Sequence, residues 1–125
     1  MTKIAILEYS LYRHINQLSR SIKKGIESVG VEVEHLRCAE TLPSEILEQM
    51  HAPPKPEDVR ELTPADVNEL EGFDGIMFGV SARFGGIPAQ IKTIMDATGG
   101  LWQNGKLVGK TAGVFQSTGT MQGGQ

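Results

Sequence analysis

Cysteine is almost absent from this sequence, and long hydrophobic runs are missing altogether. The single cysteine, Cys38, excludes an intrachain disulfide and is typical of a reducing compartment. Because Cys38 has no partner that would make it a nucleophile, we interpret it as a structural or surface thiol. The apolar runs fall far short of the roughly 20 residues of a membrane span, and no signal-peptide core precedes the first predicted strand. We therefore expect a cytoplasmic protein without a transmembrane segment.

The sequence also lacks the patterns of several common functions. A formal charge of −3 and a pI near 5.6 argue against a nucleic-acid partner, which would favour a basic stripe. The three histidines, His14, His35 and His51, fall on different predicted elements, so we expect no metal site. No G-x-S-x-G elbow of a serine hydrolase is present. A receiver-type phosphoacceptor would need clustered carboxylates at the predicted strand ends, where only Glu8 is found.

The apolar pattern predicts one α/β domain with a doubly wound parallel sheet. Short apolar runs at 3–7 and 75–80 are typical of central strands that are covered on both faces. Residues 31–36 alternate apolar with polar, which predicts a half-exposed strand at the sheet edge. With a further strand at 111–116, the chain would follow the flavodoxin-like order 2-1-3-4-5, counted along the sequence, with four of the five strands present.

Helical signals lie between these strands. A stripe at three- and four-residue spacing predicts a helix from about residue 15 that ends at Gly30. Pro88 should open a helix that Gly99 and Gly100 stop. Shorter helices are expected at 44–50 and from Thr63 to about residue 69, with the proline-rich residues 51–56 as an ordered surface connection. The sheet-facing residues would be Ile15, Leu18, Ile22, Ile26 and Val29 in the first helix, and Ile91, Ile94 and Met95 in the later one.

Three predicted strands end in loops that suit a ligand. The loop at 9–15 joins a strand directly to a helix, whose first turn leaves backbone N–H groups free to hold a phosphate. Ser10 and His14 add donors there, although Ser10 could equally be a helix cap and His14 a surface residue. In the loop 81–86, Arg83 and Phe84 could offer a donor and a stacking surface, or Phe84 could be core. The loop 117–124 adds hydroxyls and open N–H groups.

Four motifs in matching order resemble the WrbA family of flavodoxin-like NAD(P)H:quinone oxidoreductases. The resemblance covers the whole chain and rests on Tyr9-Ser10-x-Tyr12-x-His14-Ile15, Arg83-Phe84-Gly85, Thr98-Gly99-Gly100-Leu101-Trp102 and Phe115-x-Ser117-Thr118-Gly119-Thr120. It implies an FMN cofactor that takes a hydride from NADH or NADPH and passes two electrons to a quinone. No side chain need act as acid or base, because the flavin carries the chemistry. Such two-electron reduction suggests a protective role against redox cycling.

The resemblance also assigns site residues. Tyr12 would lie near the nicotinamide nucleotide, and Trp102, which is otherwise a default core residue or a candidate lid, near the quinone. The FMN phosphate would be surrounded by Ser10, Leu11, Tyr12, Arg13, His14 and Ile15. The isoalloxazine would be lined by Ala82, Arg83 and Phe84, and Ser117, Thr118, Gly119, Thr120, Met121 and Gln122 would close over the ribityl chain and ring.

The chain departs from the family pattern at several positions. Arg13 stands where members have glycine, and it could either contact the phosphate or pair with Glu8, which replaces an aromatic or aliphatic residue. Residues 80–82 replace Thr-Pro-Thr, and Met121 and Gln122 interrupt a glycine run. Two alternatives stay open for this reason: a non-catalytic or membrane-peripheral scaffold that has lost FMN, and a one-electron flavodoxin carrier.

The end of the chain is a further departure. Family members continue into a further strand with a flavin-facing histidine and a final helix, and they assemble as dimers of dimers whose neighbouring subunits complete each site. The residues present end in a glycine-rich loop that would leave strand 111–116 as an apolar edge. We therefore expect residues 1–125 to be a C-terminally incomplete flavodoxin-like domain that is a homo-oligomer at full length.

Overall fold

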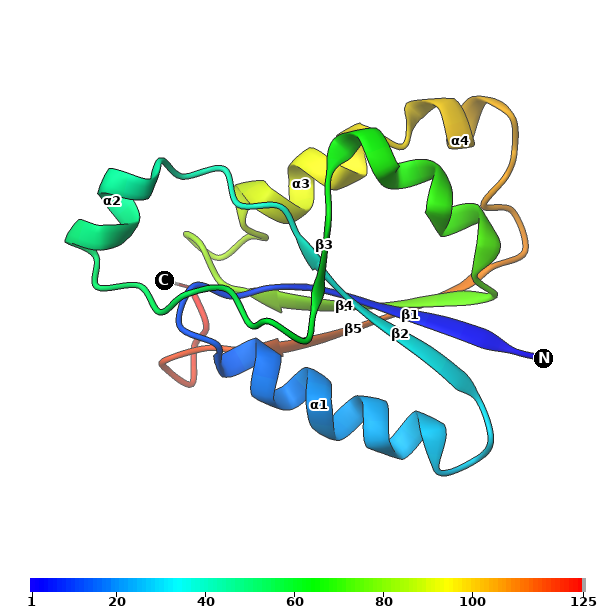
Figure 1. Cartoon of the computed structure of the whole chain (residues 1–125), viewed down its shortest axis with the longest axis horizontal. Coiled ribbons are helices and arrows are strands. Elements are labelled where there is room, and N and C mark those ends of the chain that lie inside the picture. The colour runs from blue at the N-terminus through cyan, green and yellow to red at the C-terminus, as the bar shows by residue number, and fades with distance from the viewer. Residues whose placement is uncertain (125) are drawn as a thin grey trace.

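A parallel five-stranded sheet forms the centre of the computed structural model, which describes residues 1–124 (Figure 1). The strand order is β3-β2-β1-β4-β5, and every neighbouring pair is parallel. The four predicted strands are all present and in the predicted relative order. The strands are β1 (Lys3–Tyr9), β2 (Glu32–Cys38), β3 (Arg60–Leu62), β4 (Gly75–Ser81) and β5 (Thr111–Ser117).

Helices cover both faces of this sheet. The helix α1 (His14–Glu27) lies on one face, and the 3-10 helix η1 (Pro64–Gly72), α3 (Ala89–Asp96) and α4 (Gly99–Gln103) lie on the other (Figure 1). The short α2 (Ser44–Gln49) follows β2. Buried side chains of the sheet and of η1, α3 and α4 form the main core. None of the helices within residues 1–124 has the length and the apolar character of a membrane span.

The strand β3 is missing from the prediction, and its presence corrects the predicted sheet edge. It has only three residues and pairs with the end of β2, where Leu62 is the register partner of Cys38. Leu62 is fully buried, and Arg60 forms ion pairs with Glu34 of β2 and Glu69 of η1. The predicted strand 31–36 is therefore an inner strand, and its carboxyl half is buried.

The predicted apolar stripe of the first helix is wrong in part. Ile15 is buried as expected, but Leu18 and Val29 are exposed, at 37% and 75% of their surface. Asn16 and Ser19 face the sheet instead and are buried. The reason lies in β1, where Glu8 is 1% exposed and needs hydrogen-bond donors from the helix above it.

The region after β4 also differs from the prediction. Ile91 and Ile94 are buried as predicted, but Met95 is 39% exposed. Gly99 and Gly100 do not simply stop a helix: α3 ends at Asp96 and these glycines begin α4. Trp102 on α4 is 80% exposed, so it is not a core residue.

The predicted ordered connection at 51–56 is confirmed, and the backbone explains how it begins. His51 has φ 54°, and its N–H and that of Ala52 bond back to Glu48 and Leu47. This is the left-handed helix ending that glycine usually provides. At η1, Thr63 and Asp66 form the expected cap, reinforced by a reciprocal capping box.

Candidate functional site at the carboxyl edge of the sheet

A cavity of about 510 Å³ opens at the carboxyl ends of β1, β4 and β5, beside the start of α1. Cavities of about 300–1,000 Å³ are typical of small-molecule sites, and this edge is where parallel α/β sheets bind their ligands. The cavity is lined by Ser10, Leu11, Tyr12, His14, Ile15, Met50, Ser81, Arg83, Ser117, Thr118 and Gly119.

The turn between β1 and α1, residues 10–13, forms one side of the cavity; we call it the first turn. Arg13 ends it with φ 68° and ψ 12°, and no side chain caps the N-terminus of α1. The positive end of the helix dipole therefore faces the cavity without a capping carboxylate. Such a helix end binds anions.

One residue of the cavity wall has a buried hydroxyl without a partner. Ser81 Oγ has no hydrogen-bond partner within the described part of the chain. Ser81 is in register with Ser117 of β5, and both residues line the cavity. Because buried polar groups are normally satisfied, an orphaned hydroxyl in a cavity wall suits a polar ligand. This observation fits the heteroatom-rich FMN that the sequence predicts.

The loop after β4 is a tight turn with an exposed tip. Arg83 and Gly86 exchange backbone hydrogen bonds of 2.9 Å, with Phe84 and Gly85 at φ 53° and 79°. Positive φ at both central positions is the type I′ geometry. Arg83 donates to the Ala82 carbonyl at 2.9 Å and lines the cavity, whereas Phe84 is 97% exposed, which corrects its alternative interpretation as core.

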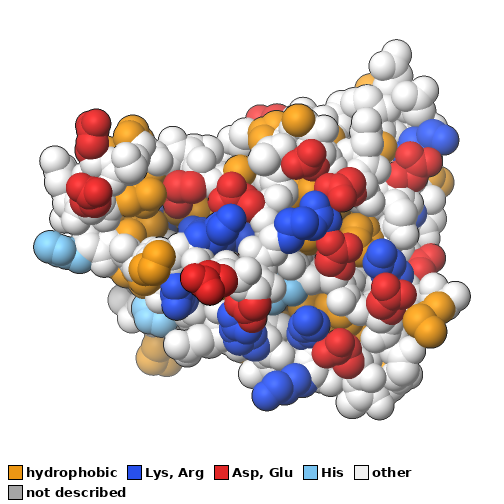
Figure 2. All heavy atoms as spheres, viewed as in Figure 1, with side chains coloured by type: hydrophobic (Ala, Val, Ile, Leu, Met, Phe, Trp, Pro, Cys, Tyr) orange, Lys and Arg blue, Asp and Glu red, His pale blue; other side chains and the backbone are white. Residues whose placement is uncertain are grey.

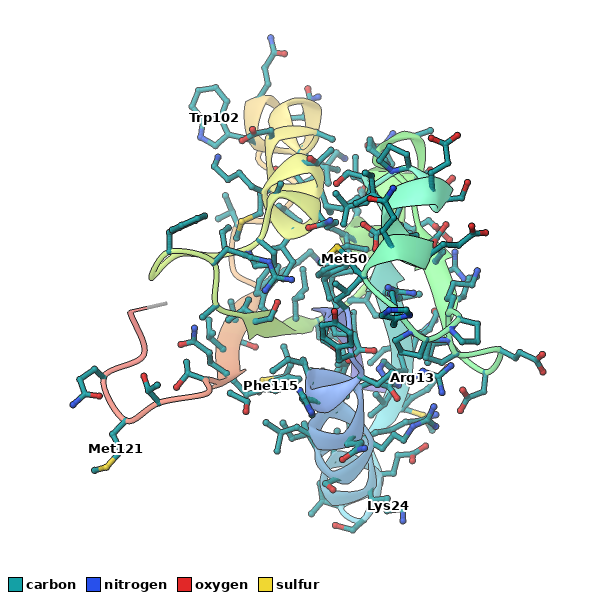
Figure 3. The ribbon with its side chains drawn as sticks, turned by 90° about the vertical axis from the view of Figure 1, so that its left-hand side faces the viewer. Arg13, Lys24, Met50, Trp102, Phe115 and Met121 are labelled. Carbon is teal, nitrogen blue, oxygen red and sulfur yellow. The ribbon has the colours of Figure 1, made fainter. Side chains whose placement is uncertain are left out.

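The Arg13 side chain belongs to the first turn but does not line the cavity. Its Nη2 donates to the carbonyl of Pro54, and its Nε is buried. It does not pair with Glu8, as one of the two sequence-based hypotheses allowed. Glu8 instead accepts hydrogen bonds from Asn16 and Ser19, at 2.8 and 2.7 Å. Arg13 therefore leaves the cavity open, and Met50, which sequence reasoning missed, forms part of its wall (Figure 3).

Below the cavity, Glu40 ties three elements together. Its carboxylate accepts a hydrogen bond from Tyr9 Oη at 2.6 Å and from Gln90 Nε2 at 2.7 Å. Burial and this carboxylate raise the pKa of Tyr9 well above its usual range. The Tyr9 phenol therefore stays protonated at physiological pH and serves to fix the end of β1.

The structure brings most of the sequence-predicted residues together. Those that line the cavity are Ser10, Leu11, Tyr12, His14, Ile15, Arg83, Ser117, Thr118 and Gly119. Six others border the cavity loops without lining it: Arg13, Ala82, Phe84, Thr120, Met121 and Gln122. Met121 is fully exposed, and Trp102 lies on α4, apart from Arg13 and Phe115 (Figure 3).

The sheet order, the covering helices and the cavity position define a flavodoxin-like α/β protein. A solved structure described as a flavodoxin, WrbA-like protein, from Agrobacterium tumefaciens, shares this fold with a TM-score of 0.66 at 20% identity, over 98% of this chain and 64% of that one. The family model described as NADPH-dependent FMN reductase matches residues 2–125. The chain belongs to the NADPH-dependent FMN reductase family.

Individual curated proteins resemble this chain more specifically than the family model does. The chain is 51% identical to a quinone-oxidoreductase of Triphysaria versicolor, over 99% of this chain and 59% of that protein. It is 50% identical to the minor allergen Alt a 7 of Alternaria alternata, over 98% of this chain and 59% of the allergen. An NAD(P)H quinone oxidoreductase of Candida albicans is 48% identical, over 98% and 42%. The chain thus spans about three fifths or less of these relatives, and they confirm the resemblance that the motifs indicated.

Proposed function

We propose that this chain carries the FMN site of an NAD(P)H:quinone oxidoreductase. The observation that carries the proposal is the orphaned Ser81 hydroxyl in a cavity at the carboxyl edge of the sheet. The relatives named as quinone oxidoreductases support the substrate class. The direction of the Arg13 side chain supports it too, because the residue that could have blocked the cavity points elsewhere.

The cavity residues divide the work of binding. The N-terminal N–H groups of α1, with Ser10 and His14, would hold the phosphate. The hydroxyls of Ser81, Ser117 and Thr118 would bind the ribityl chain or the polar edge of the ring. When bound, FMN supplies the two-electron chemistry between NAD(P)H and a quinone, and the protein orients and shields it.

The exposure of Tyr12 and Trp102 fits an active site that is shared between copies of the chain. Tyr12 is 47% exposed at the mouth, where the nicotinamide nucleotide would pass. Trp102 is 80% exposed and does not line this chain's own cavity, so we propose that it contacts the quinone in a neighbouring copy. The oligomer that this requires is part of the proposal for the full-length protein, of which residues 1–125 would be an incomplete flavodoxin-like domain.

Flavin binding tests the proposal. The visible absorption spectrum should shift when FMN is added to the purified chain, and a titration gives the dissociation constant. Ser10→Ala removes one hydrogen bond to a charged group, so the affinity should fall by about 1.5–3 kcal/mol. Ser28→Ala is the matched control, because Ser28 lies at the opposite end of α1 and donates to Gly25.

The control variant should bind FMN like the wild type. If the wild-type chain and a longer version both fail to bind FMN, the oxidoreductase proposal is wrong and a non-catalytic scaffold becomes the better interpretation. If Ser10→Ala binds as tightly as Ser28→Ala, the phosphate lies elsewhere in the cavity.

A further inference from the structure

Residues 50–54 begin at the cavity, where Met50 forms part of the wall, whereas Ala52, Pro53 and Pro54 do not line it; we call residues 50–54 the wall segment. The segment follows α2, and its last backbone N–H bond runs from Ala52 to the Leu47 carbonyl of that helix, at 3.0 Å. Pro53 and Pro54 have no N–H to donate. The position of the wall segment therefore depends on contacts from elsewhere in the chain.

Those contacts come from the first turn. Tyr12 Oη donates to the Met50 carbonyl at 2.9 Å, and Arg13 Nη2 donates to the Pro54 carbonyl. In the described part of the chain, no other side chain forms a hydrogen bond to residues 50–54. Two adjacent residues thus hold both ends of the wall segment, 38 and 41 positions further along the sequence.

We propose that Arg13 is a positioning residue that holds the wall segment, and with it Met50, against the cavity. Its left-handed backbone, φ 68°, is one that L-residues adopt at a cost, so this site favours glycine unless the side chain has a task. The guanidinium lies in a cleft with Pro53, Pro54 and Pro56, where its Nε is buried without a partner in the described part of the chain and its Nη2 donates to the Pro54 carbonyl at an exposed position. A hydrogen bond from a charged donor is stronger than one from a neutral donor.

Holding the wall segment in place would affect ligand binding at the mouth of the cavity. Met50 lines the cavity and is 39% exposed, and its unbranched thioether adapts to the ligand it meets. Arg13 itself does not line the cavity. It would therefore act on ligand binding through the wall segment, without touching the ligand. The inference rests on the proposed function only for the identity of that ligand.

Hydrogen exchange of the flavin-free chain tests the proposal directly. Arg13→Met keeps the backbone cost and the apolar stem but removes the donors, so the Ala52 amide should exchange about tenfold faster, as expected for losing one charge-assisted hydrogen bond. Arg20→Met is the matched control. Arg20 on α1 pairs with Asp58, which lies on the same connection but outside the cavity, so this variant should leave Ala52 exchange unchanged.

A parallel FMN titration separates this proposal from the proposed function. Arg13→Met should bind FMN several-fold more weakly than the wild type, together with faster Ala52 exchange. Weaker FMN binding with unchanged Ala52 exchange would mean that Arg13 contacts the phosphate directly, and would overturn the proposal. Unchanged exchange and affinity would overturn it as well.

If no variant binds FMN, the proposed function fails, and the exchange rates still decide whether Arg13 holds the wall segment. Should Arg13→Met fail to fold, Arg13→Gly provides the same test, because glycine accepts φ 68° without strain.

Discussion

At the scale of single residues, the buried hydroxyls of two serines have opposite roles. Ser19 is fully buried, and its hydroxyl donates to Glu8 at 2.7 Å. Ser81 lines the cavity, and its Oγ is buried without a partner in the described part of the chain. The first hydroxyl therefore stabilises the fold, whereas the second is available for a ligand.

Substitution of these serines should separate stability from binding. Ser81→Ala removes an unsatisfied hydroxyl, so the free energy of unfolding without ligand should stay level or rise by up to about 1 kcal/mol, while FMN affinity falls. Ser19→Ala should lower the free energy of unfolding by about 1–3 kcal/mol, because Glu8 loses a donor. Urea unfolding and FMN titration measure both quantities. A Ser81→Ala chain that is destabilised as much as Ser19→Ala would contradict this assignment.

Cys38 should be inert to thiol reagents in the folded chain. The side chain is fully buried, and burial, with a smaller effect of the Glu8 carboxylate, raises the pKa of its thiol to about 12. The thiolate is the reactive form, so at pH 8 it is scarce as well as inaccessible. A disulfide reagent should label Cys38 only at the rate of unfolding, and at once in urea. Fast labelling of the folded chain would show that β2 opens locally.

At the scale of elements, a buried polar cluster joins β1, α1 and β2. Glu8 Oε1 lies 3.2 Å from His35 Nε2 of β2, and two donors of α1 complete the cluster. Burial alone would raise the pKa of Glu8. The His35 contact and the donors outweigh it, so the pKa of Glu8 is lower than its ordinary 4.5. The cluster therefore stabilises the folded chain through the charged carboxylate.

The lowered pKa of Glu8 determines how the free energy of unfolding should change with pH. A carboxylate whose folded pKa is depressed contributes its full stabilisation above its unfolded pKa, near 4.5, and loses it as pH falls through the folded value. Glu8→Gln should lower the free energy of unfolding at pH 7 by about 1.5–3 kcal/mol and flatten its decline below pH 4.5. Urea unfolding between pH 7 and 3 measures this. The control is Glu32→Gln at an exposed position of β2, which should leave the curve unchanged.

The same cluster explains which elements could be predicted from the sequence. The long apolar strands and the prolines at helix starts depend on local pattern, and they are found where expected, whereas Gly99 and Gly100 begin α4 instead of ending a helix. The burial of Asn16 and Ser19 could not be predicted from helical periodicity, because it depends on a carboxylate in another element. The strand β3 was missed because three residues of mixed polarity carry no pattern, and only its pairing with β2 defines it.

At the scale of the whole molecule, the parts of the candidate site that lie at strand ends could be predicted from the sequence. The parts that depend on contacts between residues far apart in the sequence could not. The three loops at the strand ends meet as expected, because parallel strands bring their carboxyl ends to one edge. Met50 and the direction of Arg13 depend on contacts between residues 38 and 41 positions apart. No local sequence pattern indicates such contacts. The sequence does show that Arg13, which has a left-handed backbone in the turn, departs from the glycine of the family pattern.

The surface of the molecule carries mixed charges over the face shown in Figure 2, and its apolar residues there are scattered. The free edge of the sheet is different. No strand within residues 1–124 pairs with the outer side of β5, and Val114 in its centre is 68% exposed. An unpaired strand edge with apolar side chains favours association between copies.

We therefore expect the 125-residue chain to associate as its concentration rises, and Val114→Lys to suppress this, because a charge on an edge strand opposes pairing. Val29→Lys is the control: Val29 is 75% exposed and lies just after α1, outside every strand of the sheet described in residues 1–124. Both variants should unfold within about 0.5 kcal/mol of the wild type, as surface substitutions do. Light scattering during size-exclusion chromatography measures the mass. Equal association in both variants would show that β5 is not the contact, and a monomer at every concentration would show that the β5 edge is protected in solution.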